Sequence, residues 1–464
     1  MMTHIFPKRI FASDGVKADH LYEKQPLQIG LSERKTTVLE TNDYLILDFG
    51  AEVCGGVRIL TYHASNVSVR IRFGESLSEC CSDLGGTTNA TNDHSLRDFS
   101  VDLQHYSDMT FGQTGFRFVR LDASGHLELK CIVATNHMLK QPARYRYEGR
   151  DQTIRAIYNA AKRTIDLCAS QGWVWDGIKR DRLVWIGDMA PEVIALTTLY
   201  GRLACIERSL DFVKDQTPLP GWMNGMPAYS MWWMIILSEY YERTGARDYV
   251  GRQMVYLSEL IRQMDGCIRA DGTLDYPSYF VDWPTHGQPD EQMGVRAINV
   301  IALTKAIGLL RAFEQDASLA EELLARLRKI EIVVQKSKQV LALKYFATGL
   351  SECEREMLVA GGAQGMSTFM SYYILTAVAS FDKTQAVEMM KEYFGGMLDK
   401  GATAFWEDFD LEWCKNSSRI DEFPKENEQD LHGEFGAFCY QGFRHSLCHG
   451  WSAGVIGFMK EQNL

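Results

Sequence analysis

The sequence lacks the features that mark membrane, nucleic-acid-binding and secreted proteins. Its 464 residues carry a formal net charge of −11, whereas nucleic acids and anionic membranes are bound through basic patches. The N-terminal residues do not lead into the apolar run of a signal peptide, and no apolar run approaches the length of a membrane span. We therefore expect a cytoplasmic protein that binds neither nucleic acid nor a membrane.

Patterns typical of disulfide frameworks and metal sites are also missing. The eleven cysteines form no repeated CxxC spacing, and an odd number cannot all pair, so reduced thiols are expected. His445 and His449 are four residues apart and could share a helical face as zinc ligands, but no third ligand is evident. Cys448 beside His449 does not predict a thiol nucleophile, because sequence neighbours rarely form a catalytic pair. No metal or organic cofactor is expected.

Tryptophan is absent from the first 172 residues, which indicates two parts of different design. The first part shows the alternation of half-buried strands, with turn residues between them. The strands are expected near residues 44–50, 67–73, 116–121 and 127–133. Such a series favours an antiparallel β-sandwich, which we place at residues 1–144.

After about Arg144 the hydrophobic period becomes helical. Helices are expected from residue 153 and near residues 189–213, 228–244, 248–268, 292–314, 318–344, 366–380 and 385–398. An all-α domain over residues 145–464 could be a bundle, a solenoid or a closed ring of hairpins. No repeat of fixed period is visible, which weighs against the solenoid.

Residues 176–188 combine three carboxylates, a cationic cluster and a tryptophan within one short segment. A helix built only for packing would instead repeat apolar residues every three or four positions. Asp188 fits the N-cap of a helix that starts at Met189, which leaves Asp176 and Asp181 at the mouth of that helix. Carboxylates near arginine and tryptophan suit acid/base chemistry on a neutral, ring-shaped substrate.

The longer connections between the helices carry the other unusual residues. Each pairs tryptophan with an acid, an amide or an imidazole, which suits a sugar, because sugar rings have apolar faces and hydroxyl edges. If these loops share one end of the helical domain, they form a carbohydrate pocket. The loops are residues 220–224, 275–284, 401–410 and 446–452.

These motifs resemble the α-L-rhamnosidases of glycoside hydrolase family 78. The resemblance rests on Asp-Gly-x-Lys-Arg-Asp-Arg-x-x-Trp-x-Gly-Asp at 176–188 and on Gly-Ala-Thr-Ala-Phe-Trp-Glu at 401–407. Residues 280–284, 448–454 and 48–56 add support, in the order of the family. The resemblance implies an (α/α)6 six-hairpin barrel preceded by a β-sandwich.

The resemblance also implies residue roles. Asp181 stands at the position of the general acid, and Glu407 at that of the general base that activates water. Five residues match sugar-binding or subsite positions: Asp176, Arg180, Trp185, Asp188 and His449. The tryptophan-bearing loops add four substrate-binding residues: Trp222, Asp282, Trp283 and Trp406.

Two departures from the family are visible. Many relatives have glutamate at the acid position, in a motif one residue longer, where this chain has the shorter Asp181. The chain also ends soon after His449, so we expect a minimal form without the β-domain that many relatives carry after the barrel.

The implied reaction is an inverting, exo-acting hydrolysis that releases terminal L-rhamnose from a glycoside or oligosaccharide. An inverting mechanism requires the Asp181 and Glu407 carboxyl groups to lie roughly 6.5–9.5 Å apart. Two alternatives stay open: an exo-glycosidase for another sugar on the same barrel, and a catalytically impaired carbohydrate-binding protein. The oligomeric state is not determined by the sequence.

Several of these residues have simpler structural explanations. Asp181 between two arginines could be a surface ion pair, and Glu407 beside Asp408 and Asp410 could belong to a solvated acidic loop. At least one of Trp232 and Trp233 could be core. The motifs in combination favour the functional interpretation.

Overall fold

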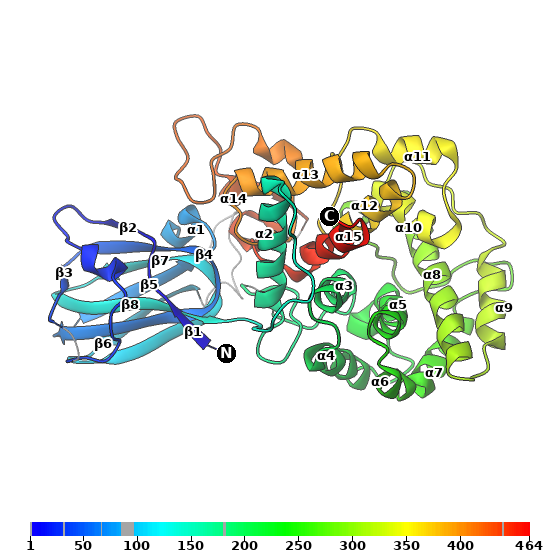
Figure 1. The fold of residues 1–464 in the computed structure, drawn as a ribbon, viewed down its shortest axis with the longest axis horizontal. Coiled ribbons are helices and arrows are strands. Elements are labelled where there is room, and N and C mark those ends of the chain that lie inside the picture. Colours follow the sequence, from blue (N-terminus) through cyan, green and yellow to red (C-terminus); the bar gives the residue numbers. More distant parts are fainter. Residues whose placement is uncertain (1, 31–32, 66, 85–96, 180–181, 439) are drawn as a thin grey trace.

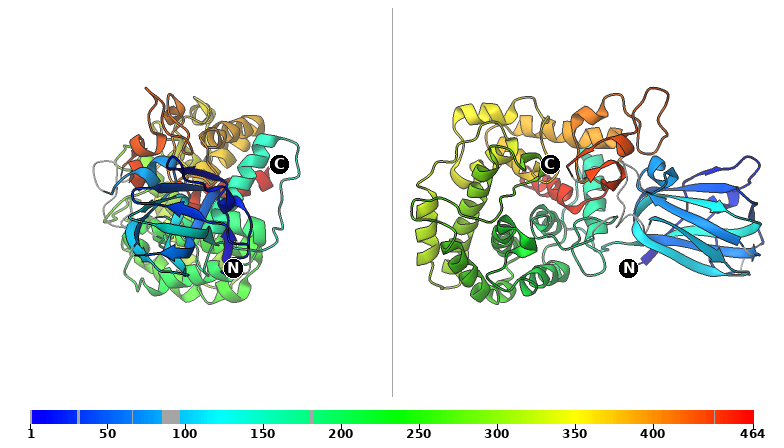
Figure 2. Two further views of the ribbon diagram at one scale, coloured as in Figure 1. Left: turned by 90° about the vertical axis from the view of Figure 1, so that its left-hand side faces the viewer. Right: turned by 180° about the vertical axis from the view of Figure 1, so that it is seen from behind.

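The computed structural model describes residues 2–30, 33–65, 67–84, 97–179, 182–438 and 440–464. The long strands gather at one end of the molecule and the long helices at the other (Figures 1 and 2). The last strand of the N-terminal part, β8, ends at His137, and the first long helix, α2, begins at Gln152. The predicted boundary between residues 144 and 145 falls in this connection and stays a prediction.

The strands of the N-terminal part form one hydrogen-bonded sheet with antiparallel pairing, as expected. The main path runs β1-β8-β4-β7-β5-β6, with β2 paired to β4 and β3 to β8. Their bounds are β1 Met2–Ile5, β2 Arg9–Ala12, β3 Thr37–Leu39, β4 Tyr44–Ala64, β5 Val67–Gly74, β6 Asp98–Leu103, β7 Asp108–Ala123 and β8 Leu127–His137. A short helix, α1, spans Leu77–Cys81, and a two-stranded ribbon, β9 Gly436–Ala437 with β10 Tyr440–Gln441, lies in the C-terminal part.

The alternation of apolar and polar residues explains why β5 forms a strand with one buried face. Val67, Val69, Ile71 and Phe73 are buried at 1% exposure or less, whereas the residues between them are polar. β4 has 21 residues, and register shifts interrupt its pairing with β7 and β8. Such irregularities bend a long strand, so the sheet curls around its own apolar core.

The helical part consists of α2 to α15. The bounds are α2 Gln152–Cys168, α3 Met189–Tyr200, α4 Ala204–Asp215, α5 Pro227–Thr244, α6 Arg247–Gly251, α7 Met254–Asp265, α8 Glu291–Ala312, α9 Ser318–Leu327, α10 Lys338–Thr348, α11 Glu352–Val359, α12 Ser371–Ala379, α13 Lys383–Asp399, α14 Leu431–Glu434 and α15 Val455–Glu461. Contacts run from α3 to α5, α8, α10, α12 and α15 in turn, and α15 returns to α3. These six helices therefore surround a common centre (Figure 1).

Three of the predicted helices are interrupted. The segment 248–268 divides into α6, which ends at Gly251, and α7, which begins at Met254. The segment 189–213 divides into α3 and α4, because Gly201 has φ 75° and ends α3. The segment 318–344 divides into α9 and α10. We did not predict α11, although Ser351 and Glu354 form a capping box at its start.

α8 is the exception to the expected lack of membrane-length apolar segments. Its 22 residues are long and apolar enough to cross a membrane, but 78% of the apolar window is buried inside the protein. α8 packs against α5, α9 and α10, which explains its composition as that of a core helix. Trp232 and Trp233 of α5 are both fully buried, so both belong to the core.

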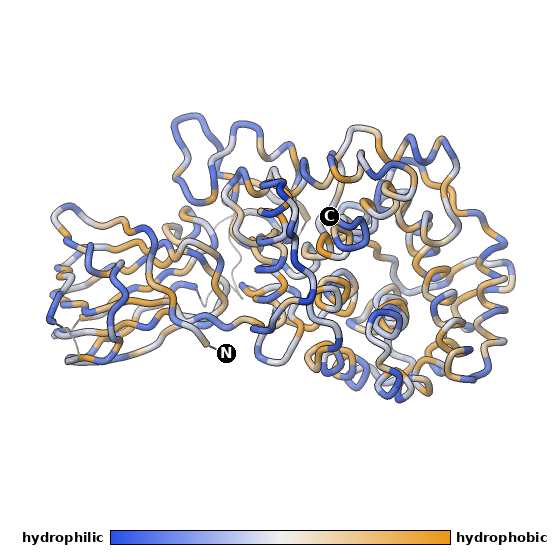
Figure 3. The backbone as a smooth tube through the Cα atoms, viewed as in Figure 1, coloured by the Kyte–Doolittle hydropathy of each residue, from blue (hydrophilic) through white to orange (hydrophobic). Residues whose placement is uncertain are grey.

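One long loop outside this core is polar. The loop of residues 421–430 projects from the helical part and is mostly hydrophilic (Figure 3). The ten cysteines that the structure describes are free thiols.

Candidate active site

A cavity of about 290 Å³ in the helical part brings together five of the predicted substrate-binding residues. They come from loops that are far apart in the sequence: residues 176–188, 278–286 and 449–451. The five lining residues are Asp176, Trp185, Asp188, Trp283 and His449. Two of the four tryptophan-bearing loops that we expected to share one end of the helical domain, 275–284 and 446–452, therefore meet residues 176–188 at one cavity, whereas residues 220–224 and 401–410 do not line it.

Asp176 lies in the loop between α2 and α3, where two hydrogen bonds join it to Leu183. Its Oδ1 accepts a hydrogen bond from Leu183 N at 2.9 Å, and its backbone N–H donates to Leu183 O at 3.0 Å. Gly450 N donates to Asp176 O at 2.6 Å, and Gly177 forms an antiparallel bridge with His449. Asp176 thus ties both ends of residues 176–183 to the loop that carries His449.

Asp188 occupies the N-cap position of α3, as predicted, but its side chain makes no capping hydrogen bond. Asp188 has helical backbone angles, and its Oδ1 accepts a hydrogen bond from Tyr229 Oη at 3.2 Å. Gly187 permits this approach, because a Cβ there would lie 2.5 Å from the Tyr229 ring. Burial raises the pKa of Asp188 well above its ordinary value, and nearby Asp176 raises it further. These two effects favour a protonated Asp188.

Glu407 lies behind His449, in the lining of a smaller adjacent cavity, where hydrogen bonds hold its side chain and its backbone. It is 1% exposed, and its Oε2 accepts a hydrogen bond from Ser446 N at 3.1 Å. Its Oε1 lies 3.4 Å from His449 Nε2. Its backbone carbonyl accepts from Trp451 Nε1 at 2.9 Å and from Thr368 Oγ1 at 2.5 Å. The carboxylate is therefore fixed in one orientation beside His449.

The interpretation of residues 407–410 as a solvated acidic loop is wrong for the first two of them. Glu407 is buried, and burial raises the pKa of Asp408 to about 7. His445 Nε2 accepts a hydrogen bond from Asp408 N at 2.9 Å. Asp410 is exposed and caps a short helix.

Aromatic rings form much of the lining of the same cavity. Trp185 meets Tyr229 with ring centroids 6.1 Å apart, and Phe280 meets Trp283 at 5.2 Å. Trp185 and Trp283 are half-buried, so part of each ring faces open space. Flat apolar rings together with carboxylates provide both surfaces that a sugar needs.

The remaining described predictions lie outside the lining of this cavity. Asp282 is 2% exposed and lines a smaller adjacent cavity with Glu407, where its carboxylate accepts from Thr285 N at 3.1 Å and Ser367 Oγ at 2.7 Å. Trp406 is fully buried against Phe409. Trp222 packs edge-on against Tyr276, with ring centroids 5.5 Å apart. The positions of Trp406 and Trp222 are those of packing residues.

Arg180 and Asp181 lie outside the residues that the structure describes. The predicted separation between the Asp181 and Glu407 carboxyl groups therefore stays a prediction, as does the surface ion-pair interpretation of Asp181.

The arrangement of possible metal ligands differs from the predicted histidine pair. Asp176, Asp188 and His449 have ligand atoms within 4.8 Å of one another, a set that could hold a divalent cation. His445 points elsewhere, toward Asp408.

Sequence reasoning missed part of the lining. Tyr229 lies in the apolar start of α5, where its spacing is that of a core residue, and only its contact with Asp188 distinguishes it. The other missed residues are Met226, Ser278, Tyr279, Phe280, His286 and Trp451. Most of these residues belong to the tryptophan-bearing loops or flank them, so the position of those loops in the sequence could have identified them.

No protein-family model and no curated protein sequence matches the chain. Solved structures do match it. A rhamnosidase from Klebsiella oxytoca with rhamnose bound has a TM-score of 0.74 at 18% identity, covering 100% of this chain and 96% of the other. The GH78 family rhamnosidase of Bacillus sp. GL1 gives 0.72 at 19% identity over 93% of this chain, and the α-L-rhamnosidase of Streptomyces avermitilis complexed with L-rhamnose gives 0.64 at 15% over 90%.

The chain spans 48% of the Bacillus protein and 42% of the Streptomyces protein. At these identities the comparison concerns the fold. The resemblance that the sequence motifs predicted is thus confirmed at the level of structure: this chain has the fold of the α-L-rhamnosidases, among them a member of glycoside hydrolase family 78.

Proposed function

We propose that this chain is a glycoside hydrolase that releases a terminal α-L-rhamnosyl group from a glycoside or oligosaccharide with inversion of configuration. The observation that carries the proposal is the cavity that Trp185 and Trp283 line together with Asp176, Asp188 and His449, with Glu407 Oε1 3.4 Å from His449 Nε2. The fold shared with rhamnose-bound structures supports L-rhamnose as the sugar. In this proposal the ring of α3, α5, α8, α10, α12 and α15 is the inner wall of an (α/α)6 barrel, residues 145–464 are the catalytic domain, and the curled sheet of residues 1–144 is a β-sandwich.

Glu407 is the proposed general base. Ser446 N donates to its Oε2, which fixes the orientation of the carboxyl group that is to accept a proton from water. Its other oxygen, Oε1, lies on the side of His449 and the cavity, where a water molecule could be held. A fixed carboxylate with one oxygen committed to the backbone and the other directed at the sugar site suits this role.

Asp181 is the proposed general acid. It belongs to the segment that Asp176 ties down at Leu183, two residues beyond Asp181. In the proposed reaction Asp181 protonates the glycosidic oxygen while Glu407 removes a proton from water on the opposite face of the ring. Asp176, Asp188 and His449 bind hydroxyl groups, and the two tryptophans cover the apolar face and the methyl group of the sugar.

The proposal is tested by hydrolysis of p-nitrophenyl α-L-rhamnopyranoside, with the anomer of the first-formed sugar identified by NMR. Inversion produces β-L-rhamnose. Glu407→Gln and Asp181→Asn should each lower kcat by about 10²- to 10⁴-fold. Asp410→Asn changes an exposed aspartate of the same loop as Glu407 and should keep full activity.

Full turnover in both the Glu407→Gln and Asp181→Asn variants would refute the mechanism. Hydrolysis of another α-L-glycoside instead of the rhamnoside would identify a different exo-glycosidase. L-Rhamnose binding without turnover of any aryl glycoside would identify a carbohydrate-binding protein.

A further inference from the structure

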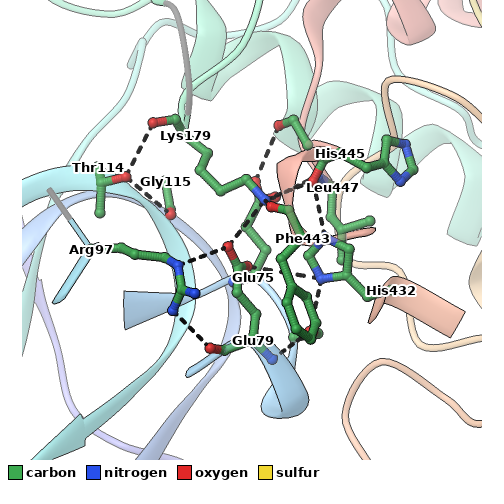
Figure 4. A network of polar contacts seen from close by, with 12 residues as sticks. Glu75, Glu79, Arg97, Thr114, Gly115, Lys179, His432, Phe443, His445 and Leu447 are labelled. Carbon is green, nitrogen blue, oxygen red and sulfur yellow. Dashed lines mark hydrogen bonds and ion pairs between the residues drawn. The ribbon is translucent and has the colours of Figure 1, made fainter. Parts of the chain in front are cut away.

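A buried ionic cluster, here called the junction cluster, joins the sheet to the helical part beside the candidate active site (Figure 4). It consists of Glu75, which directly follows β5, Glu79 of α1, and Lys179 from the loop before α3. Lys179 Nζ lies 3.0 Å from Glu75 Oε2 and 3.2 Å from Glu79 Oε1. The side chains of both glutamates are fully buried, and that of Lys179 is 3% exposed.

Two buried cations contact this cluster: Lys179 contacts both glutamates, and Arg97 Nε lies 3.9 Å from Glu79 Oε1. Glu75, Glu79 and His432 have ligand atoms within 4.8 Å of one another, but the ammonium group already contacts both carboxylates. His432 Nε2 donates to His445 O at 2.9 Å, so its Nδ1 accepts from Ser76 Oγ at 2.8 Å. Burial and the positive charge of Lys179 lower the pKa of His432 well below its ordinary value. The three groups are therefore committed to protein partners, and the cluster has a structural role in place of a metal-binding one.

Glu75 reaches Glu407 through two adjacent peptide groups. Leu447 N donates to Glu75 Oε2 at 2.6 Å, and Ser446 Oγ donates to Glu75 Oε1 at 3.3 Å. The neighbouring Ser446 N donates to Glu407 Oε2 at 3.1 Å. The position of residues 446–447, and with it the orientation of Glu407, thus depends on a glutamate of the sheet part.

Lys179 connects the same cluster to the segment of the proposed acid. Besides the two glutamates, its Nζ donates to Phe443 O at 2.9 Å and to His445 O at 2.6 Å. Lys179 stands three residues after Asp176, which lines the cavity, and two residues before Asp181 in the sequence. One ammonium group therefore ties the start of the acid-bearing segment to the loop that orients the base.

We propose that Glu75 and Lys179 are positioning residues, which set the relative placement of the acid-bearing segment 176–188 and of Glu407 from the sheet side of the junction. The inference deepens the proposed function and rests on it. It assigns the N-terminal sheet a part in catalysis, although none of its residues lines the cavity among those that the structure describes.

The test compares substitutions of Glu75 in the full-length chain. Glu75→Ala removes the carboxylate that accepts the hydrogen bond from Leu447 N. Glu75→Asp keeps a carboxylate there, but its side chain is shorter by one methylene group. Misplacement of a reacting group by about 1 Å can cost about 100-fold in rate, so both variants should lower kcat by about 10- to 100-fold, with KM within about twofold. Glu75→Gln can still accept from Leu447 N and donate to Ser446 Oγ, so it should retain most of the activity.

A pH profile separates positioning from a general loss of folded protein. Without Glu75, Ser446 N supports ionised Glu407 less well, so the acidic limb of the kcat/KM profile should move to higher pH. Asp48→Asn is the matched control. Asp48 is 3% exposed and binds Arg117, which contacts Asp421 of the helical part, but it does not touch residues 446–447. This variant should keep the wild-type profile.

Unchanged kcat in both the Glu75→Ala and Glu75→Asp variants would overturn the inference, and so would an equal loss in Asp48→Asn. If Glu75→Ala does not fold, the kcat of Glu75→Asp decides between the two outcomes.

If the wild-type chain hydrolyses no glycoside, the proposed function fails, and amide hydrogen exchange still tests the positioning role of Glu75. Glu75→Asp should then accelerate exchange in residues 176–179 and 443–449, whereas Asp48→Asn should not. Equal exchange in the Glu75→Asp variant and the wild type would refute it.

Discussion

Two buried clusters in this protein use the same residue types for different purposes. Glu75, Glu79 and His432 lie at the junction of sheet and helices, and Asp176, Asp188 and His449 lie at the cavity. In each cluster the ligand atoms are within 4.8 Å of one another. The junction cluster is closed around Lys179, whereas the pocket cluster borders a cavity of about 290 Å³ that tryptophan rings also line. Buried acids and imidazoles therefore indicate function where they face open space, and structure where a side chain of the protein occupies the position between them.

The largest expected effect concerns the junction cluster. Lys179→Met removes the cation that contacts Glu75 and leaves Glu79 with Arg97 at 3.9 Å. Removal of one partner of a buried ion pair costs about 3–5 kcal/mol of the free energy of unfolding. Urea denaturation measures the loss. Lys344→Met is the control, because the Lys344–Glu354 pair is more exposed, at 10% and 15%. An equal loss of unfolding free energy in Lys179→Met and Lys344→Met would show that Lys179 stabilises the fold no more than a lysine in a more exposed ion pair.

The next effect concerns the aromatic wall of the pocket. Trp283→Ala removes a ring surface from the cavity and should raise KM for the aryl rhamnoside by about tenfold, or about 1.4 kcal/mol. Trp222→Ala removes a tryptophan that packs on Tyr276 outside the lining, so KM should stay within about twofold. A comparable rise in both variants would show that Trp222 also binds the sugar.

A further effect, which accumulates over several pH units, concerns the pH dependence of stability beside Glu407. Burial raises the pKa of Asp408 to about 7. A raised folded-state pKa contributes stability at pH values below the ordinary aspartate pKa, and this contribution is lost as pH rises through 7. Relative to Asp408→Asn, the wild type should therefore lose at most about 1.4 kcal/mol per pH unit between pH 4 and 7.

Thermal or urea unfolding at a series of pH values measures this difference. The control is Asp410→Asn in the exposed part of the same loop, which should parallel the wild type throughout. A constant difference between the wild type and Asp408→Asn would contradict the raised pKa.

The smallest effect is expected from metal removal. Lys179 fills the junction cluster, and the proposed acid/base reaction at the pocket needs no metal. EDTA or added Ca²⁺ should leave kcat and the unfolding midpoint unchanged within error. A loss of activity with EDTA that Ca²⁺ or Zn²⁺ restores would show that Asp176, Asp188 and His449 hold a cation.

Local patterns predicted the type of most long elements. The alternation at residues 67–73 corresponds to β5, and the apolar residues near 228–244 correspond to α5. Interruptions were missed where one residue decides the backbone, as Gly201 does between α3 and α4. α11 was missed because only one of its residues, Leu358, is buried, so its hydrophobic period is weak.

The sequence predicted only part of the candidate site, because residue types along the chain do not fix where each side chain points. The resemblance led to Trp185 and His449, and tryptophan beside an acid in a loop led to Trp283; all three line the cavity. The same rule also selected Trp406 and Trp222, which pack elsewhere. A motif specifies which residues are available, but the direction of each side chain depends on the neighbours that the fold supplies.

The sequence by itself determined the change from strands to helices, the resemblance to the α-L-rhamnosidases and the two motifs that carry the proposed acid and base, because these depend on residue types and spacing along the chain. Only the tertiary structure decided that the Asp188 side chain bonds Tyr229 instead of capping α3, that Ser446 orients Glu407, and that Glu75 and Lys179 lie behind both motifs. These contacts join residues up to 372 positions apart, and their geometry follows from packing that no local pattern contains.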